Sequence, residues 1–183
     1  MTTIIGIQGR GWAVMAADSQ ITEENSKIIS SDTPKIIKYK NLLIGLRGDA
    51  RPGDIIALSW TPPRITESPK KWIVDKMVPS MIEIFDYHRY DWKEKEADFS
   101  FMVCVKGEIF DVGSDFSISR SDYGIYGAGT GKDLAVGCVS GQKQILGEID
   151  LEKAKALAYT AVEIASRFDV NTSAPIQVEV MTK

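Results

Sequence analysis

Three pairs of short apolar segments, each joined by a tight turn, set the limits on how this chain can fold. Residues 3–8 and 12–17 flank Gly9-Arg10-Gly11, residues 35–39 and 42–46 flank Lys40-Asn41, and residues 99–106 and 108–112 flank Gly107. Runs rich in β-branched and aromatic residues that are separated by short polar or glycine turns are typical of β-hairpins. The sequence therefore predicts that the two strands of each pair run antiparallel, and it predicts two further strands at residues 123–126 and 176–181.

Helical patterns separate these strands. Short helices are expected over residues 55–60 and 132–140, and a longer one over 69–87 with a kink or break at Pro79. Asp150 is a good N-cap for an amphipathic helix that continues to Phe168 and carries a stripe of alanines and leucines. Residues 19–31 are polar and predict a loop with weak strand character. The pattern indicates an α+β domain, with two antiparallel sheets and helices outside them.

Composition narrows the class of protein. The 183 residues fit a single domain, residues 1–183, and 44% hydrophobic with 26% charged residues is typical of a globular chain. A net charge of −3 without a basic block argues against nucleic-acid binding, and no apolar stretch is long enough to cross a membrane. We see no secretory signal, and Cys104 and Cys138 lie in apolar segments as reduced core residues do. A cytoplasmic location is therefore expected.

Scarcity of certain residues excludes several kinds of site. With one histidine, His88, and two cysteines, a zinc site is not expected, and His88 lies in a polar helix end that does not suit a catalytic triad. The segment Gly127–Asp133 is glycine-rich like a phosphate loop, but Tyr126 replaces the first glycine and Asp133 the Ser or Thr that binds magnesium. No cofactor and no metal are expected.

Chemistry is instead concentrated at the start of the chain. Removal of Met1 would leave Thr2 with a free amine, whose pKa of about 8 allows it to accept the proton of the adjacent hydroxyl. A nearby ammonium paired with an acid would favour ionisation of that hydroxyl. Asp18, after the second strand, and Lys35, before the third, are candidates for this pair. The strand end at residues 45–48 offers backbone N–H groups for a developing oxyanion.

Several ordered motifs resemble one family over nearly the whole chain. Thr2-Thr3-Ile4-Ile5-Gly6-Ile7, Ala16-Ala17-Asp18, Lys35-Ile36-Ile37 and Gly45-Leu46-Arg47-Gly48-Asp49-Ala50 are similar to proteasome β-type subunits and the bacterial HslV peptidase, which are N-terminal-nucleophile hydrolases. The resemblance implies a four-layer αββα sandwich of two antiparallel sheets flanked by helices.

The same resemblance assigns roles to individual residues. It implies that Thr2 is the nucleophile and its amine the base, that Asp18 and Lys35 tune it, and that the Gly45 N–H stabilises the oxyanion. Asp169 and Thr172 would orient the amine. Four further residues are expected to line the pocket for the substrate side chain: Ile21, Thr33, Leu43 and Arg47.

The chain departs from the family pattern at two places. Ala128 stands where the family usually has the serine of Gly-Ser-Gly, with Thr130 two residues on, and Ser173-Ala174 replaces a pair of glycines. The first change concerns the organisation of the amine.

The function these features predict is a threonine endopeptidase that forms an acyl-enzyme on Thr2 after methionine removal. The resemblance implies a homo-oligomeric ring that encloses its active sites, with peptide or unfolded-protein substrates and an ATPase or cap partner left unspecified. Two alternatives stay open: a non-catalytic structural subunit of the same fold, and an amidohydrolase that acts on a small amide.

Overall fold

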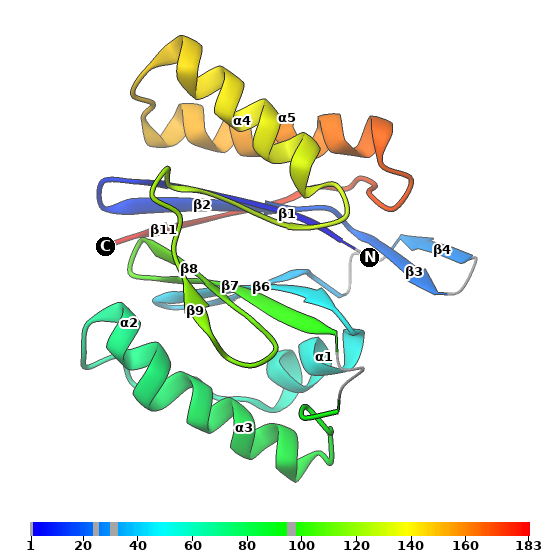
Figure 1. Ribbon diagram of the computed structural model, residues 1–183, viewed down its shortest axis with the longest axis vertical. Coiled ribbons are helices and arrows are strands. Elements are labelled where there is room, and N and C mark those ends of the chain that lie inside the picture. The colour runs from blue at the N-terminus through cyan, green and yellow to red at the C-terminus, as the bar shows by residue number, and fades with distance from the viewer. Residues whose placement is uncertain (1, 24–25, 30–32, 95–97) are drawn as a thin grey trace.

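The computed structural model describes residues 2–23, 26–29, 33–94 and 98–183. Its elements stack in four layers, with two facing antiparallel sheets between two groups of helices (Figure 1). One outer layer contains α4 (Lys132–Leu146) and α5 (Leu151–Phe168), and the other contains α1 (Ala50–Ser59), α2 (Pro69–Trp72) and α3 (Val78–Tyr87). The αββα sandwich expected from the sequence is confirmed.

The first sheet has the strand order β10-β1-β2-β11 and packs under α4 and α5. Its strands are β1 (Thr3–Gly9), β2 (Trp12–Ala17), β10 (Ile125–Gly129) and β11 (Gln177–Thr182). Successive side chains of a strand point to opposite faces. Ile4 accordingly belongs to the core between the sheets, and Ile5 and Ile7 to the core beneath the helices. Because both faces are covered, β1 and β2 are almost continuously apolar.

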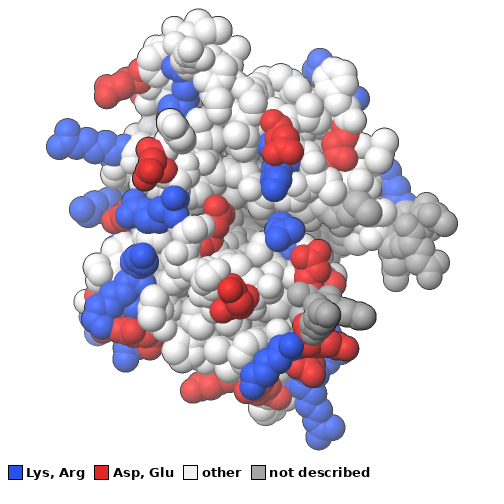
Figure 2. All heavy atoms as spheres, viewed as in Figure 1, with Lys and Arg blue, Asp and Glu red and all other residues white. Residues whose placement is uncertain are grey.

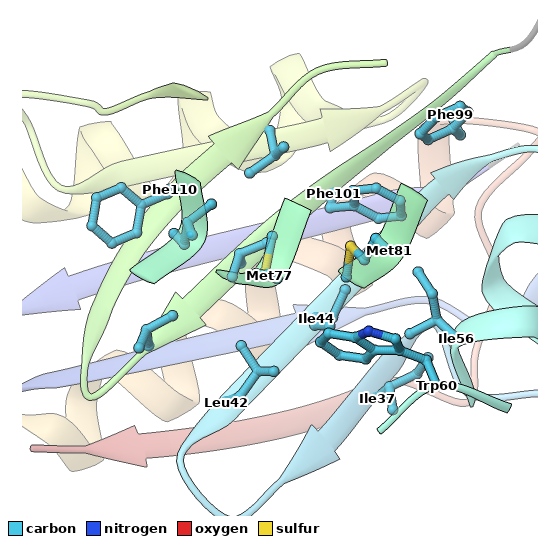
Figure 3. Close-up of a cluster of buried hydrophobic side chains, with 14 of the residues drawn as sticks. Ile37, Leu42, Ile44, Ile56, Trp60, Met77, Met81, Phe99, Phe101 and Phe110 are labelled. Atoms are coloured by element: carbon cyan, nitrogen blue, oxygen red, sulfur yellow. The ribbon is translucent and has the colours of Figure 1, made fainter. Parts of the chain in front are cut away.

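The second sheet has the strand order β5-β6-β7-β8-β9. These strands are β5 (Ile36–Tyr39), β6 (Leu42–Gly48), β7 (Phe99–Val105), β8 (Glu108–Val112) and β9 (Ile118–Ser119). Its outer face packs on α1 to α3, where Phe101, Trp60 and Met81 meet in one apolar cluster (Figure 3). Burial of a large apolar side chain of this kind contributes about 2–3 kcal/mol.

A two-stranded ribbon replaces part of the loop predicted over residues 19–31. Its strands β3 (Gln20–Glu23) and β4 (Ser26–Ile29) pair antiparallel and project from the body of the sandwich (Figure 1). Ile28 and Ile29 are 44% and 46% exposed, so the ribbon has little core of its own. The weak strand character expected here is realised as this ribbon, and the loop prediction understated it because polar residues reduce the strand signal when neither face of a ribbon is fully buried.

The helices also differ in detail from their predicted ranges. The helix predicted over 69–87 continues through a π-helical turn (Ile73–Met77) that joins α2 to α3 immediately before Pro79. The changed hydrogen-bond pattern of a π turn accommodates a residue that has no N–H, so the expected irregularity lies a few residues before the proline. Helix α1 begins at Ala50 rather than residue 55, and α4 extends to Leu146 rather than residue 140.

The described surface and ends of the chain have three further features. The described helices include none that is long and apolar enough to cross a bilayer. Basic and acidic side chains are intermingled on the face shown in Figure 2. Thr2 and Lys183 lie at opposite ends of the first sheet, since Thr2 precedes β1 while the Lys183 N–H donates to the Gly11 carbonyl in the β1–β2 turn (3.0 Å).

Candidate functional site

A buried ion pair lies where the two sheets meet at the start of the chain. Asp18 directly follows β2, and Lys35 directly precedes β5, so the packing of one sheet on the other brings the two together. Lys35 Nζ lies 2.6 Å from Asp18 Oδ1, and the two side chains are only 9% and 0% exposed. Burial lowers the pKa of the Lys35 ammonium, while the charge and hydrogen bond of Asp18 oppose this shift. The predicted Asp18–Lys35 pair is therefore formed in the structure.

Three backbone amides complete the coordination of the Asp18 carboxylate. The N–H of Thr3 donates to Oδ1 at 2.8 Å, and those of Gln20 and Ser173 donate to Oδ2 at 2.9 and 3.2 Å. Because the Thr3 amide and the Lys35 ammonium share one oxygen atom, the ammonium lies beside the peptide group that follows Thr2. The carboxylate thus fixes the charge of Lys35 next to the start of β1.

Contacts to its backbone carbonyl hold Thr2 in place. Its carbonyl oxygen accepts a hydrogen bond from the Thr130 N–H at 2.8 Å, and the side of Gly129 packs so closely that a Cβ there would lie 1.7 Å from that oxygen. Gly129 also has a φ of +88°, which favours glycine. Thr2 is 6% exposed and lines the cleft described below. The structure therefore places the predicted nucleophile at a defined position.

A second carboxylate, Asp169, is linked to Thr3 through the Thr172 hydroxyl. It follows α5, and its Oδ2 accepts hydrogen bonds from the hydroxyls of Thr130 (2.7 Å) and Thr172 (2.6 Å). The Asn171 N–H donates to Oδ1 at 3.2 Å. Burial raises the pKa of Asp169, but these hydrogen bonds outweigh it and lower the pKa below its ordinary value. Asp169 and Thr172 thus lie together, as predicted.

Thr3 links the two acidic centres, and sequence reasoning missed it. Its side chain is fully buried, its hydroxyl lies 2.6 Å from the Thr172 hydroxyl, and it accepts the Gly131 N–H at 3.1 Å. Its backbone N–H binds Asp18. The signal available in the sequence was a second threonine at a position that alternation assigns to the inside of a buried strand, where a hydroxyl needs a partner.

Thr130, rather than the residue at position 128, supplies the hydroxyl that contacts Asp169. Ala128 lies within β10, and its side chain packs against the core between the sheets. Thr130 lies between Gly129 and Gly131, immediately before α4. The family's serine was assigned to position 128 rather than 130 because two Gly-x-Gly units, Gly127-Ala128-Gly129 and Gly129-Thr130-Gly131, overlap in the sequence. The step from strand to helix would have identified the second unit.

A cleft of about 390 Å³, here called the threonine cleft, opens beside Thr2 between the β3 ribbon, β6 and α1. Of the residues predicted to contact a substrate side chain, Ile21, Thr33 and Arg47 line it. Leu43 does not, since it is fully buried in the core between the sheets. Leu46, whose side chain lies on the helix-covered face of β6, lines the cleft instead. The prediction for Leu43 was wrong because the strand presents it to the opposite face.

Gly45 also lies away from the threonine cleft. A Cβ at this position would meet Met15 Cε at 2.7 Å and Ile4 Cδ1 at 3.2 Å, so glycine is needed for the two sheets to approach. The next amide, Leu46 N–H, donates to the Lys35 carbonyl at 2.9 Å. Amides alternate in direction along a strand, so the Gly45 N–H faces β7. The structure therefore gives Gly45 a packing role and does not direct its amide at Thr2.

The site contains the Lys35 ammonium, which is paired with Asp18, and a second carboxylate, Asp169, which is held by hydroxyl groups. In the described residues no group of three or more His, Cys, Asp or Glu side chains has the arrangement of a metal site. Cys104 in β7 and Cys138 on α4 are free thiols, and burial raises the pKa of Cys104 to about 12. The arrangement holds Thr2 by its backbone, places the Lys35 ammonium in the same cleft and anchors the hydroxyls of Thr130 and Thr172 on Asp169.

Comparisons with known proteins identify a matching family model and a shared fold. Residues 1–57, which include Thr2, Asp18, Lys35 and Gly45, match the family model "Proteasome subunit". The chain has the fold of the proteasome and HslV peptidases. The structure of Thiobacillus denitrificans BPH in complex with epoxomicin superimposes with a TM-score of 0.77 at 20% identity, covering 99% of this chain and 98% of that one.

Two other structures show the same fold. Thiobacillus denitrificans BPH on its own gives a TM-score of 0.75 at 19% identity, with 99% and 98% of the two chains covered. Eukaryotic HslV from Trypanosoma brucei gives 0.68 at 20% identity, with each chain covered completely. No curated protein matched the sequence. The resemblance that the motifs suggested is thus confirmed for residues 1–57 by the family model, and the expected fold is confirmed over the whole chain by the solved structures.

Proposed function

We propose that this chain is the subunit of a threonine peptidase, which hydrolyses peptide bonds through an acyl-enzyme on Thr2 after removal of Met1. The single observation that carries this proposal is that hydrogen bonds join both anchored carboxylates to Thr3, the neighbour of Thr2, with Asp18 bound directly and Asp169 through Thr172. Asp18 fixes Lys35 on one side, and Asp169 fixes Thr130 and Thr172 on the other. A fold that used its first residues only for packing would not need two buried polar networks around them.

The chemistry requires a free amine on Thr2, which removal of Met1 would expose. The amine takes the hydroxyl proton as the oxygen attacks the peptide carbonyl, and the Lys35 ammonium stabilises the developing negative charge on that oxygen. The C–N bond breaks, the amine returns its proton to the leaving nitrogen, and an ester remains on Thr2. Water then hydrolyses the ester, with the same amine as general base.

The threonine cleft supports a peptide rather than a very small substrate. Its volume of about 390 Å³ exceeds that of a single amide group, and it extends from Thr2 to Ala57 and Leu58 on α1. It also borders Gln20, Ile21 and Thr22 of strand β3. Among the described strands, β3 pairs with β4 on one edge, and its other edge has no strand partner. An extended peptide can add to such an edge.

Assembly into a homo-oligomeric ring is part of the same proposal, and it rests on the fold and on exposed apolar side chains. Several large apolar side chains on α1, α3, α4, at the end of α5 and before β10 are more than 70% exposed: Leu58, Tyr87, Tyr123, Ile145, Phe168 and Val170. Exposed apolar side chains of this kind mark surfaces that are buried when a partner subunit packs on them. A cytoplasmic location, with an ATPase or cap as a further partner, completes the proposal, and the free thiols of Cys104 and Cys138 agree with a reducing compartment.

Intact mass and labelling together test the proposal. The assembled protein should lack Met1 and should gain the mass of one epoxyketone or β-lactone per chain, attached to Thr2. Thr2→Ala should abolish labelling and peptide turnover and leave the assembly intact. Thr160→Ala, on an exposed position of α5, is the matched control and should label normally.

Each other outcome selects one of the alternatives. Retention of Met1 under native expression would make the chain a non-catalytic subunit of this fold. Labelling of Thr2 with hydrolysis of small acylamides and none of a peptide panel would indicate an amidohydrolase. Turnover that survives Thr2→Ala would contradict the nucleophile itself.

A further inference from the structure

A second cavity lies on the far side of Arg47 from the threonine cleft. It has a volume of about 300 Å³ and opens between β8 and β9 of the second sheet and β10 of the first. We call it the Asp111 pocket, after the one carboxylate in its lining. The polar side chains that line it are Arg47, Ser100, Asp111, Ser117, Ser119 and Lys132.

The Asp111 pocket and the threonine cleft are neighbours. Arg47 lines both cavities. Gly129 forms part of the wall of the Asp111 pocket and packs against the carbonyl oxygen of Thr2 on its other side. A peptide that passes Thr2 in the cleft can therefore place a side chain in the Asp111 pocket without leaving the surface.

Positive charge exceeds negative charge in this lining. Arg47 is fixed by a hydrogen bond from its Nε to the Ser100 hydroxyl at 2.6 Å, and its other contact, Asp98, lies 3.9 Å away on a side chain that is 72% exposed. Lys132 contributes a second cation from the first turn of α4. The carboxylate of Asp111 has no hydrogen-bond partner within the described ranges of the chain. Two cations thus share one pocket with a single carboxylate that is not directly paired to either of them.

We propose that the Asp111 pocket binds an acidic side chain of the peptide substrate, between Arg47 and Lys132. The proposal rests on the proposed function, because it names the class of peptide that the same site prefers. A carboxylate from the substrate would balance the second positive charge, which Asp111 alone does not neutralise, and the hydroxyl of Ser119 would serve as a further hydrogen-bond donor.

The charge state of Asp111 supplies a readout. Burial raises the pKa of Asp111 to about 6, against the opposing effect of Arg47 and Lys132. The other titratable group that senses Asp111 is Tyr126 of β10, which lies near Arg120. Protonation of Asp111 removes the negative charge that competes with the ligand, so an acidic side chain should bind more tightly at pH 5.5 than at pH 7.5. A glutamate in the substrate stays mostly ionised over this range.

The experiment compares internally quenched peptides that differ only by Glu or Gln at one of three positions on either side of the scissile bond. The Glu/Gln ratio of kcat/KM cancels the titration of the Thr2 amine, which both peptides share. At one position the ratio should be about threefold at pH 7.5, the size of a partly exposed ion pair, and it should rise at pH 5.5. Lys132→Met should bring it close to one. Asp111→Asn should raise it at pH 7.5 and abolish its dependence on pH.

The controls separate failure of this inference from failure of the proposed function. Lys155→Met, which removes an exposed lysine of α5, should leave the ratio unchanged. Binding of the same peptides to Thr2→Ala, measured by fluorescence anisotropy, gives the Glu/Gln preference without turnover. Cleavage with equal ratios in the wild type and Lys132→Met at every position overturns the pocket assignment. A Lys132-dependent Glu preference in binding, without any turnover by the wild type, supports the pocket and contradicts the peptidase.

Discussion

Substitution of Gly131 by alanine tests the hydroxyl network that surrounds Thr2 and Thr3. A Cβ at Gly131 would lie 2.3 Å from Thr3 Oγ1, and 3.0 Å from both Asp169 Oδ2 and Thr172 Oγ1. The backbone at this position has φ −86° and ψ 7°, which alanine adopts without strain. The added methyl group therefore acts on the network alone.

The expected magnitude follows from the bonds that the methyl group displaces. The Thr3 hydroxyl is fully buried and would lose its contacts with Thr172 and with the Gly131 amide. Leaving a buried polar group unsatisfied costs about 1–3 kcal/mol. For a domain of this size we expect a loss of about 2 kcal/mol and a fall in Tm of about 4–8 °C. The rate of Thr2 labelling by an epoxyketone should fall at least about tenfold, since misplacement of reacting groups is costly.

Two other glycines of α4 provide matched controls. A Cβ at Gly137 or Gly141 would meet no atom within 4 Å. Alanine at either position should stabilise the protein by about 0.5–1 kcal/mol, because glycine weakens a helix interior. Thermal unfolding and the labelling rate are measured for all three variants. The reasoning is refuted if Gly131→Ala behaves like Gly137→Ala. It is supported further if Thr3→Ala, combined with Gly131→Ala, restores part of the lost stability.

Three further predictions concern polar and charged groups around the site. Asp111 binds a proton more tightly in the folded state (pKa about 6), so its cost to stability grows as the pH rises from about 4 to 6. Asp111→Asn should therefore raise the free energy of unfolding by about 1–2 kcal/mol at pH 7.5, after a discount for solvent screening, and leave it unchanged at pH 4, as measured by urea titration. Thr130→Ala should slow peptide turnover and Thr130→Ser should restore it, because the serine hydroxyl still reaches Asp169; equal rates would remove Thr130 from the site. Lys35→Met should abolish Thr2 labelling and lower the free energy of unfolding by about 2–3 kcal/mol, because Asp18 keeps three amide donors but loses its cation. Normal labelling of this variant would refute the role of the Lys35 ammonium.

Much of the fold could be predicted from the sequence because hairpins are local. The pair of strands around Gly9-Arg10-Gly11 and the pair around Gly107 depend on neighbouring residues and appear where expected. The register of β1 against β10 joins Thr3 to Gly129 across more than a hundred residues, and no local pattern specifies it. The same is true of the β3–β4 ribbon, whose strands form without a buried face.

In the candidate site, too, residues with a local sequence signal could be predicted, and residues whose role depends on tertiary packing could not. Asp18 and Lys35 could be identified from strand ends, and the structure brings them together. Gly45 and Leu43 could not be assigned correctly, because their role depends on which face of β6 meets the first sheet and which edge carries each amide. Thr3 was missed because a threonine inside a strand is ordinary until its backbone N–H is seen to bind Asp18 and its hydroxyl to contact Thr172, which binds Asp169.

The positions of the two ends of the chain decide where an affinity tag can be attached. Thr2 is enclosed by the amide of Thr130 and the flank of Gly129, and its amine would disappear into a peptide bond if anything were fused before it. Lys183 lies beside the β1–β2 turn, at the far end of the first sheet. A purification handle belongs there, and one placed at the other end would report an inactive protein whatever the native molecule does.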